Sequence, residues 1–150
     1  MNKKGVTLIE LIVVFVIIAI AATLMVPSFG AWLPRYRLRN TARDIASTMR
    51  TAQMKAVSNR LQYQVNFNLA PNSYILQRNS GGIVNDGALQ TAPSGITINI
   101  GGLPGGTATF NTDSTCPTGG NITLSYQKGG VIQDQRRILL NAATGRATIQ

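Results

Sequence analysis

The chain has 150 residues, with 14 Lys and Arg against 5 Asp and Glu, a formal net charge of +9 at pH 7, one Cys and no His. Without His, it cannot build a Ser-His-Asp or Cys-His catalytic triad or a His-containing zinc site. Cys116 alone can form neither an intramolecular disulfide nor a Cys-rich metal site. Five acidic residues, one of them inside an apolar segment, disfavour a hydrolase that uses two carboxylates. The composition therefore argues against an enzyme, and we expect no cofactor.

The first predicted element is an apolar helix near the N-terminus. Residues 11–26 contain one polar residue, Thr23, and extension back to Val6 gives about 31 Å of α-helix, which matches a bilayer core. Two lysines precede the segment, so the positive-inside bias places the start of the chain in the cytoplasm and the part after Pro27 outside. A cleaved secretory signal peptide has a similar pattern, but this apolar run is longer and no polar mature start follows it. We therefore expect a single-pass membrane anchor.

Glu10 does not fit a plain anchor. A carboxylate at mid-bilayer costs roughly 2.5–3.5 kcal/mol, and less near the interface. Two interpretations stay open at this point. Glu10 either lies at the level of the lipid headgroups, or it pairs with a cation inside the membrane or an assembly.

The segment KKGVTLIE at residues 3–10 resembles the processing signal of type IV pilins and type II secretion pseudopilins. In that family a prepilin peptidase removes a short basic leader that ends in Gly, the new N-terminus is N-methylated, and a Glu stands at the fifth mature position. The resemblance implies cleavage between Gly5 and Val6, N-methylation of Val6 and an assembly role for Glu10. Pro27 falls at mature position 22, where many pilins carry a helix-kinking Pro. Val6 departs from the family, in which Phe or Met is more usual at that position.

The resemblance also implies how the subunit assembles. The cleaved subunit keeps its anchor in the inner membrane, with its C-terminal domain in the periplasm, and after assembly it can stand in a cell-surface pilus. When subunits stack, the apolar helices bury one another, and Glu10 neutralises the positive N-terminus of a neighbour, which offsets a buried charge. The implied partners are other pilin or pseudopilin subunits, the prepilin peptidase and methylase, the inner-membrane assembly platform, and membrane lipid before assembly. Cleavage removes Lys3 and Lys4, which leaves 12 basic and 5 acidic side chains, or +7.

A second helical part is expected after the anchor. The stretch from Ser28 to Pro34 contains Gly30 and is flanked by prolines, which predicts a bend or a break. A helical pattern then runs from about Tyr36 to Asn59, with apolar residues at spacings of 4, 3, 4, 3 and 4 that form one helix face. That face is Leu38, Ala42, Ile45, Met49, Ala52 and Ala56.

The same segment carries a run of arginines away from its apolar face. Arg39, Arg43 and Arg50 fall on another side of the predicted helix. This side is either a solvated helix face or a surface that faces a polyanion or lipid headgroups close to the membrane.

From Leu61 onward the pattern changes to a period of two. Residues 61–69 alternate apolar side chains with Gln and Asn, which predicts a strand with one buried face. Ala70–Ser73 predicts a turn, and Tyr74–Arg78 predicts the return strand of a hairpin. Gly-Gly doublets separate the later segments and are expected to form turns, because none of them fits a phosphate-cradling loop. Further short strands are expected at Ile96–Ile100, Thr107–Phe110, Ile122–Tyr126, Arg137–Asn141 and Arg146–Ile149.

These elements predict an α+β fold, a long N-terminal helix packed on antiparallel β-sheet with its first half spanning the membrane. The expected organisation is a leader at 1–5, a transmembrane and filament-core helix at 6–27, a second amphipathic helical part at 28–60 and a β-rich globular head at 61–150. The layout, with Thr144-Gly145-Arg146 before the last strand, resembles the GspH/FimT branch of type IV pilin-like proteins. It implies a structural subunit, a minor pilin or pseudopilin, of a type IV pilus or a type II secretion pseudopilus.

Cys116 is followed by Pro117 in a Thr- and Gly-rich stretch, which favours a loop or small core residue. A reactive thiol and an intermolecular disulfide are the alternatives. Many major pilins close a C-terminal loop with two cysteines, and this chain cannot, which is more typical of minor pilins and pseudopilins.

The alternative function is that of a DNA-binding minor pilin in DNA uptake. Some members of the branch bind DNA through a basic C-terminal patch with the motif Gly-Arg-x-Arg. In this chain the motif begins with Gly145-Arg146, but its second Arg is missing. Lys128, Arg136 and Arg137 are further candidates for such a patch, since neutralisation of the DNA backbone needs only clustered cations. Tyr126 is the only aromatic residue at this end, which gives single-strand binding little support.

Overall fold

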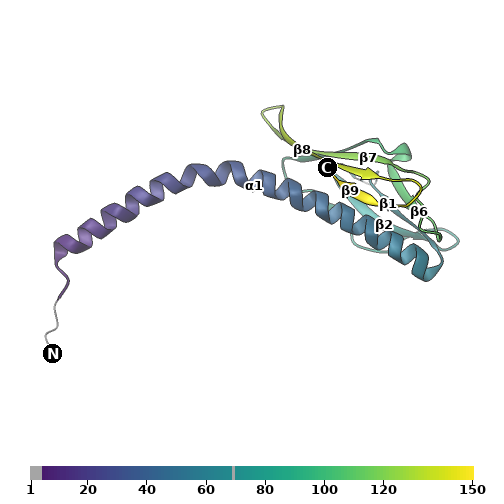
Figure 1. Cartoon of the computed structure of the whole chain (residues 1–150), viewed down its shortest axis with the longest axis horizontal. Coiled ribbons are helices and arrows are strands. Elements are labelled where there is room, and N and C mark those ends of the chain that lie inside the picture. The colour runs from purple at the N-terminus through teal and green to yellow at the C-terminus, as the bar shows by residue number, and fades with distance from the viewer. Residues whose placement is uncertain (1–4, 69) are drawn as a thin grey trace. The chain divides into compact units, whose positions relative to one another are not determined.

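The computed structural model describes residues 5–68 and 70–150 (Figure 1). Lys3, Lys4 and Leu69, which entered the predictions above, lie outside these residues. The described chain forms two compact units, one that ends at Pro34 and one that begins at Arg35. Its elements are α1 (Leu8–Asn59), β1 (Gln62–Asn66), β2 (Ser73–Asn79), β3 (Ile83–Asn85), β4 (Gln90–Thr91), β5 (Ile96–Gly102), a short 3-10 turn (Pro104–Gly106), β6 (Thr107–Phe110), β7 (Gly120–Lys128), β8 (Val131–Leu140) and β9 (Ala147–Ile149).

The helix is one element where two helical parts were expected. α1 runs for 52 residues and includes Pro27, Gly30 and Pro34. The prediction between Ser28 and Pro34 was a bend or a break, and the continuous helix contradicts the break. A proline removes one amide donor and crowds the carbonyl four residues earlier, which weakens a helix without ending it when the turns on both sides continue.

The predicted apolar face of the helix is confirmed. All six of its residues, from Leu38 to Ala56, are completely buried. Arg39, Arg43 and Arg50 are exposed, as their place on another side requires. Three of the six buried residues are alanines, whose small side chains let the helix backbone lie close to the strands.

The strands form two antiparallel sheets that share a core with the helix. The first has the order β3-β2-β1-β6, with β4 also paired to β2, and the second has the order β5-β7-β8-β9. One continuous apolar cluster joins α1 to both sheets, for example through Ile45 and Met49, Val65 of β1 and Leu124 of β7. Figure 1 shows the C-terminal part of α1 beside these strands. The α+β expectation is thus confirmed.

The alternation that predicted the first hairpin is confirmed. Tyr63 and Val65 point into the core while Gln62 and Gln64 are half-exposed, and β1 pairs with β2 from Gln62 opposite Asn79 to Asn66 opposite Ile75. The five later strands also form, and β7 and β8 are longer than predicted. β3 and β4 were not predicted, because both are very short and fully exposed and so carry no alternation.

The Gly-Gly doublets do not all form turns. Gly129-Gly130 joins β7 to β8 with φ values of 62° and 79°, which suits a two-residue hairpin turn. Gly101-Gly102 lies instead inside β5, and Gly120 begins β7. A side chain on Gly120 would overlap the carbonyl of Gly102, so glycine is needed here for the close approach of two strands.

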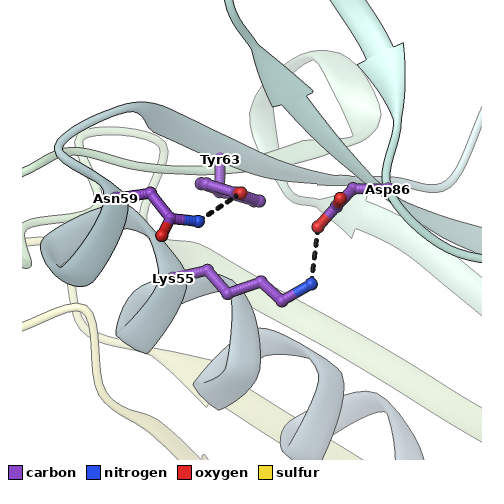
Figure 2. Close-up of polar contacts among 4 residues, drawn as sticks. All are labelled: Lys55, Asn59, Tyr63 and Asp86. Atoms are coloured by element: carbon purple, nitrogen blue, oxygen red, sulfur yellow. Dashed lines mark hydrogen bonds and ion pairs between the residues drawn. The ribbon is translucent and has the colours of Figure 1, made fainter.

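Two polar contacts hold the C-terminal end of α1 (Figure 2). Lys55 Nζ lies 2.6 Å from Asp86 Oδ2, and Asn59 Nδ2 donates a hydrogen bond of 2.8 Å to Tyr63 Oη. The Lys55 ammonium also lies 6.0 Å from the centre of the Tyr63 ring, at the limit of a cation–π contact. These contacts join the last turns of α1 to β1 and to the loop after β3.

A glutamine on α1 holds the turn that precedes β9. Gln53 Nε2 donates hydrogen bonds of 2.7 Å to Thr144 O and 3.1 Å to Ser114 O. Gly145, in the same turn, is buried with φ = 62°. A Cβ on Gly145 would overlap Ser114 O and the amide of Gln53, so the turn that resembles the Gly-Arg turn of the GspH/FimT branch fits only a glycine.

We predict that Gly145→Ala destabilises the protein more than Gly129→Ala does. Both glycines have φ = 62°, so both substitutions incur the left-handed strain of about 1–2 kcal/mol. A Cβ on Gly129 meets no atom within 4 Å, whereas one on Gly145 displaces Gln53 and its two hydrogen bonds. We expect Gly145→Ala to lower the free energy of unfolding by a further ~1–3 kcal/mol, measured by denaturant unfolding of the full chain in mild detergent. An equal loss in the two variants would contradict the packing argument.

Candidate functional site

The N-terminus of α1 is closed by a capping box between Thr7 and Glu10. Thr7 N and Thr7 Oγ1 donate to Glu10 Oε2 at 2.9 and 3.1 Å, and Glu10 N donates to Thr7 Oγ1 at 3.4 Å. The pattern Thr-x-x-Glu is the sequence signature of this cap, and a carboxylate in the first turn also suits the helix dipole. Glu10 was expected to act through its charge alone. The capping-box pattern Thr7-Leu8-Ile9-Glu10 is nevertheless present in the sequence. In the single chain Glu10 thus has local partners.

Gly5 and Val6, the predicted processing position, stand free of the rest of the described chain. Both are exposed, and Val6 exposes 77% of its surface. A Cβ built on Gly5 would meet no atom within 4 Å. Packing among the described residues therefore does not require a glycine at position 5.

The first part of α1 exposes apolar side chains on all sides. Every residue from Gly5 to Thr23 is exposed. A helix that is apolar all round is typically buried in a large core or a membrane. The large apolar residues exposed here are Leu8, Ile9, Leu11, Ile12, Val13, Val14, Phe15, Val16, Ile17, Ile18 and Ile20.

Within residues 5–68 and 70–150, no helical segment meets the length and hydropathy of a membrane span. Pro27 lies within α1, and its side chain is outside the described part of the structure.

The basic candidates on the C-terminal sheet do not form one cluster. Arg136 and Arg137 are neighbours on β8, and the alternation of a strand sends them to opposite faces. Arg136 shares the inner face with the buried Ile138, while Arg137 shares the exposed face with Leu139.

Lys128 and Arg146 lie at opposite ends of β8. Lys128 pairs with Val131, the first residue of β8, and Arg146 O accepts a hydrogen bond from Asn141 N just after its last residue. This length of strand separates the two by roughly 30 Å. Arg137 and Arg146 are both exposed. Arg146 lies in the turn between β8 and β9, and its carbonyl accepts a hydrogen bond from Asn141 N, one residue after the end of β8.

Cys116 is a small core residue. The sequence favoured either a loop residue or a small core residue at this position. It is fully buried in the apolar cluster, and its Sγ lies 3.6 Å from Thr118 Oγ1. Burial raises the pKa of the thiol, which disfavours the reactive thiolate. In the described part of the chain, no three potential metal-ligating side chains come together.

Comparison with known proteins gives one sequence motif and one fold. Residues 1–26 match the prokaryotic N-terminal methylation motif. A search of curated proteins finds no match to the chain.

The fold is similar to those of solved pilin-like structures. One is the minor pseudopilin EpsH of the type 2 secretion system of Vibrio cholerae, with a TM-score of 0.63 and 11% identity over 76% of this chain and 96% of that one. Another is the type IV minor pilin FimU of Pseudomonas aeruginosa, with a TM-score of 0.54 and 16% identity over 77% of this chain and 90% of that one. These likenesses confirm the pilin-like fold.

We predict that Cys116 in the folded chain resists alkylation. Its side chain is inaccessible and its pKa is raised, so both the collision and the thiolate needed for reaction are disfavoured. Treatment of the full chain with iodoacetamide at pH 8, followed by intact-mass analysis, should show no adduct until denaturant is added. Rapid labelling of the native chain at the same rate as the unfolded chain would revive the reactive-thiol alternative.

Proposed function

We propose that this chain, a type IV pilin-like protein of the GspH/FimT kind by its N-terminal motif and its fold, is a structural subunit that assembles through its N-terminal helix. The filament is a type IV pilus or a type II secretion pseudopilus, and the subunit is a minor pilin or a pseudopilin. The similar folds of a minor pseudopilin and of a minor pilin support both forms equally.

The observation that carries this proposal is the exposed apolar surface of the first part of α1. Burial of one large aliphatic or aromatic side chain contributes about 1.5–3 kcal/mol, and more than ten such side chains are exposed between Leu8 and Ile20. Because they cover the helix all round, no single docking face is defined. A lipid environment before assembly and a bundle of like helices after it both satisfy such a surface.

The proposal includes processing and a membrane anchor. A prepilin peptidase cleaves between Gly5 and Val6, the amino group of Val6 is methylated, and residues 6–27 hold the subunit in the inner membrane with the head in the periplasm. The match of residues 1–26 to the methylation motif and the exposure of Gly5 and Val6 support this step. Assembly then requires contact with the inner-membrane platform.

Glu10 is proposed to change partners on assembly. In the single chain its carboxylate accepts two hydrogen bonds from Thr7 and caps the helix. Among packed helices it pairs with the positive N-terminus of a neighbour, because an unpaired charge in an apolar bundle is strongly unfavourable. The cap keeps the carboxylate satisfied until that partner arrives.

We predict that Glu10→Gln is processed after Gly5 but is depleted at least about tenfold from filaments. The substitution keeps the size of the side chain and removes the charge that pairs with the neighbour. Asp44→Asn is the matched control, since it removes the same charge from an exposed position of the globular unit and should assemble normally. Gly5→Leu is the control for processing and should remain as uncleaved precursor.

The readout is intact-mass and quantitative proteomic analysis of sheared surface filaments and of inner-membrane fractions. A wild-type species that begins at Val6 in the sheared fraction identifies a pilus, and its retention in the inner membrane identifies a pseudopilus, whose assembly is then followed by crosslinking between subunits. Normal assembly of Glu10→Gln in either form would refute the partner exchange.

The second candidate function is duplex DNA binding by a minor pilin. It is favoured by the exposure of Arg137 and Arg146 and by the alternation of β8, from which we infer that both lie on one exposed face of the second sheet. Asn141, whose N donates a hydrogen bond to Arg146 O, lies four residues after Arg137, or roughly 13 Å along the strand direction. Lys128 and Arg136 lie away from that face, so this surface is smaller than the sequence alone suggested.

If this surface binds DNA, we predict that loss of Arg137 or Arg146 lowers the salt dependence of the affinity. Each phosphate contact contributes about 0.9 to the slope of log affinity against log salt, so Arg137→Gln and Arg146→Gln should each reduce the slope by about that amount. Arg78→Gln, an equal charge change on an exposed residue of β2 in the other sheet, should leave it unchanged. The absence of binding by the full chain in detergent even at low salt, or equal effects of all three substitutions, would exclude this function.

A further inference from the structure

A small cavity lies between α1 and the edge of the second sheet. Its volume is about 290 Å³. The helix provides one wall, and β8 and the end of β9 provide the other. The lining residues are Arg39, Ala42, Arg43, Arg136, Ile149 and Gln150.

Three guanidinium groups converge on this cavity. Arg39 and Arg43 are one helical turn apart on the same side of α1, where like charges repel. Arg136 approaches from the inner face of β8. No acidic side chain lines the cavity, and in the described part of the chain none of the three arginines has a carboxylate within ion-pair distance.

The acidic residues next to these arginines in the sequence face other groups. Asp134 shares a strand face with Arg136, and its Oδ1 accepts a hydrogen bond of 2.8 Å from Gln135 N. Asp44 follows Arg43 and lines a different cavity, beside Tyr74. In the described part of the chain, neither carboxylate forms an ion pair with an arginine of the cavity.

Arg136 has a buried donor with no acceptor. Its Nε is buried and makes no hydrogen bond, the only such side-chain atom in the described residues. An unsatisfied buried donor, more so on a charged group, is unfavourable, and native proteins rarely leave one without a partner from outside the chain. The hydrogen-bonding capacity of Arg136, which lines the cavity, is therefore not used up within the described part of the chain.

We propose that this cavity binds a phosphate group. A phosphate offers up to two negative charges and several acceptor oxygens, which suits three guanidinium groups better than the two oxygens and single charge of a carboxylate. Ala42 and Ile149 add apolar lining beside the arginines, which suits a small organic substituent on the phosphate. The ligand is a free phosphate or a small phosphate monoester. The site lies entirely within the unit that begins at Arg35 and does not depend on the proposed assembly.

The sequence offers a matched pair of variants for the test. Arg136→Gln and Arg78→Gln remove the same charge from strand residues of the two sheets, and only Arg136 lines the cavity. Arg43→Gln and Arg50→Gln form a second pair on α1, both exposed, of which only Arg43 lines the cavity. The second pair keeps the proposal testable if Arg136→Gln fails to fold, which circular dichroism would show.

The experiment is calorimetric titration of the full chain in detergent, at fixed ionic strength, with inorganic phosphate and with sn-glycerol 3-phosphate, and with glycerol as the control. We expect saturable binding of phosphate that Arg136→Gln and Arg43→Gln each weaken at least about tenfold, whereas Arg78→Gln and Arg50→Gln change it less than about twofold. Equal or tighter binding of glycerol 3-phosphate identifies a phosphate monoester as the ligand, and binding of phosphate alone identifies the free ion. The absence of saturable binding, or equal weakening by both members of a pair, would overturn the proposal.

Discussion

The burial of one face of α1 against two sheets is the contact on which the globular unit depends. Neither sheet is large, and each needs the helix to close the core. Because the buried face fixes the rotation of the helix about its axis, it also fixes which residues stand beside that face. Gln53 then meets the turn before β9, and Ala42 comes to line the arginine cavity. Both features follow from the spacing of Leu38, Ile45 and Met49.

The first part of the same helix lacks a single apolar face. From Leu38 onward, apolar residues keep a period and therefore a direction, whereas from Leu8 to Ile20 they surround the helix without one. A helix with one apolar face packs against one particular surface. A helix that is apolar all round can be buried in any apolar environment. In the proposed assembly this lets the subunit exchange lipid for neighbouring helices. Glu10 then provides the specificity that the apolar surface lacks, since a charge has few acceptable positions in an apolar bundle.

Much of this fold could be predicted from the sequence, because period and burial are directly linked. The six-residue helix face and the alternation in β1 are local patterns, and both were confirmed. The number of sheets depends on tertiary packing, so local patterns could not give it. The continuity of α1 through Pro34 was missed because proline weakens a helix but does not always end it. The role of Gln53 was also hidden, since its two acceptors lie 61 and 91 residues further along the chain. The helix cap formed by Thr7 and Glu10, by contrast, could have been predicted from the local pattern Thr-x-x-Glu.

The alternation of β8 also explains why adjacent arginines belong to different surfaces. From the sequence, Arg136 and Arg137 looked like one basic patch, but a strand sends neighbouring side chains to opposite faces. Arg137 meets solvent, where its charge is screened and where a partner with many phosphates has to supply many contacts. Arg136 meets the helix, where a buried donor and two further guanidinium groups suit a single compact anion. A period of two thus assigns Arg137 to the surface proposed to bind DNA and Arg136 to the cavity proposed to bind phosphate, so substitution of each residue tests a different proposal.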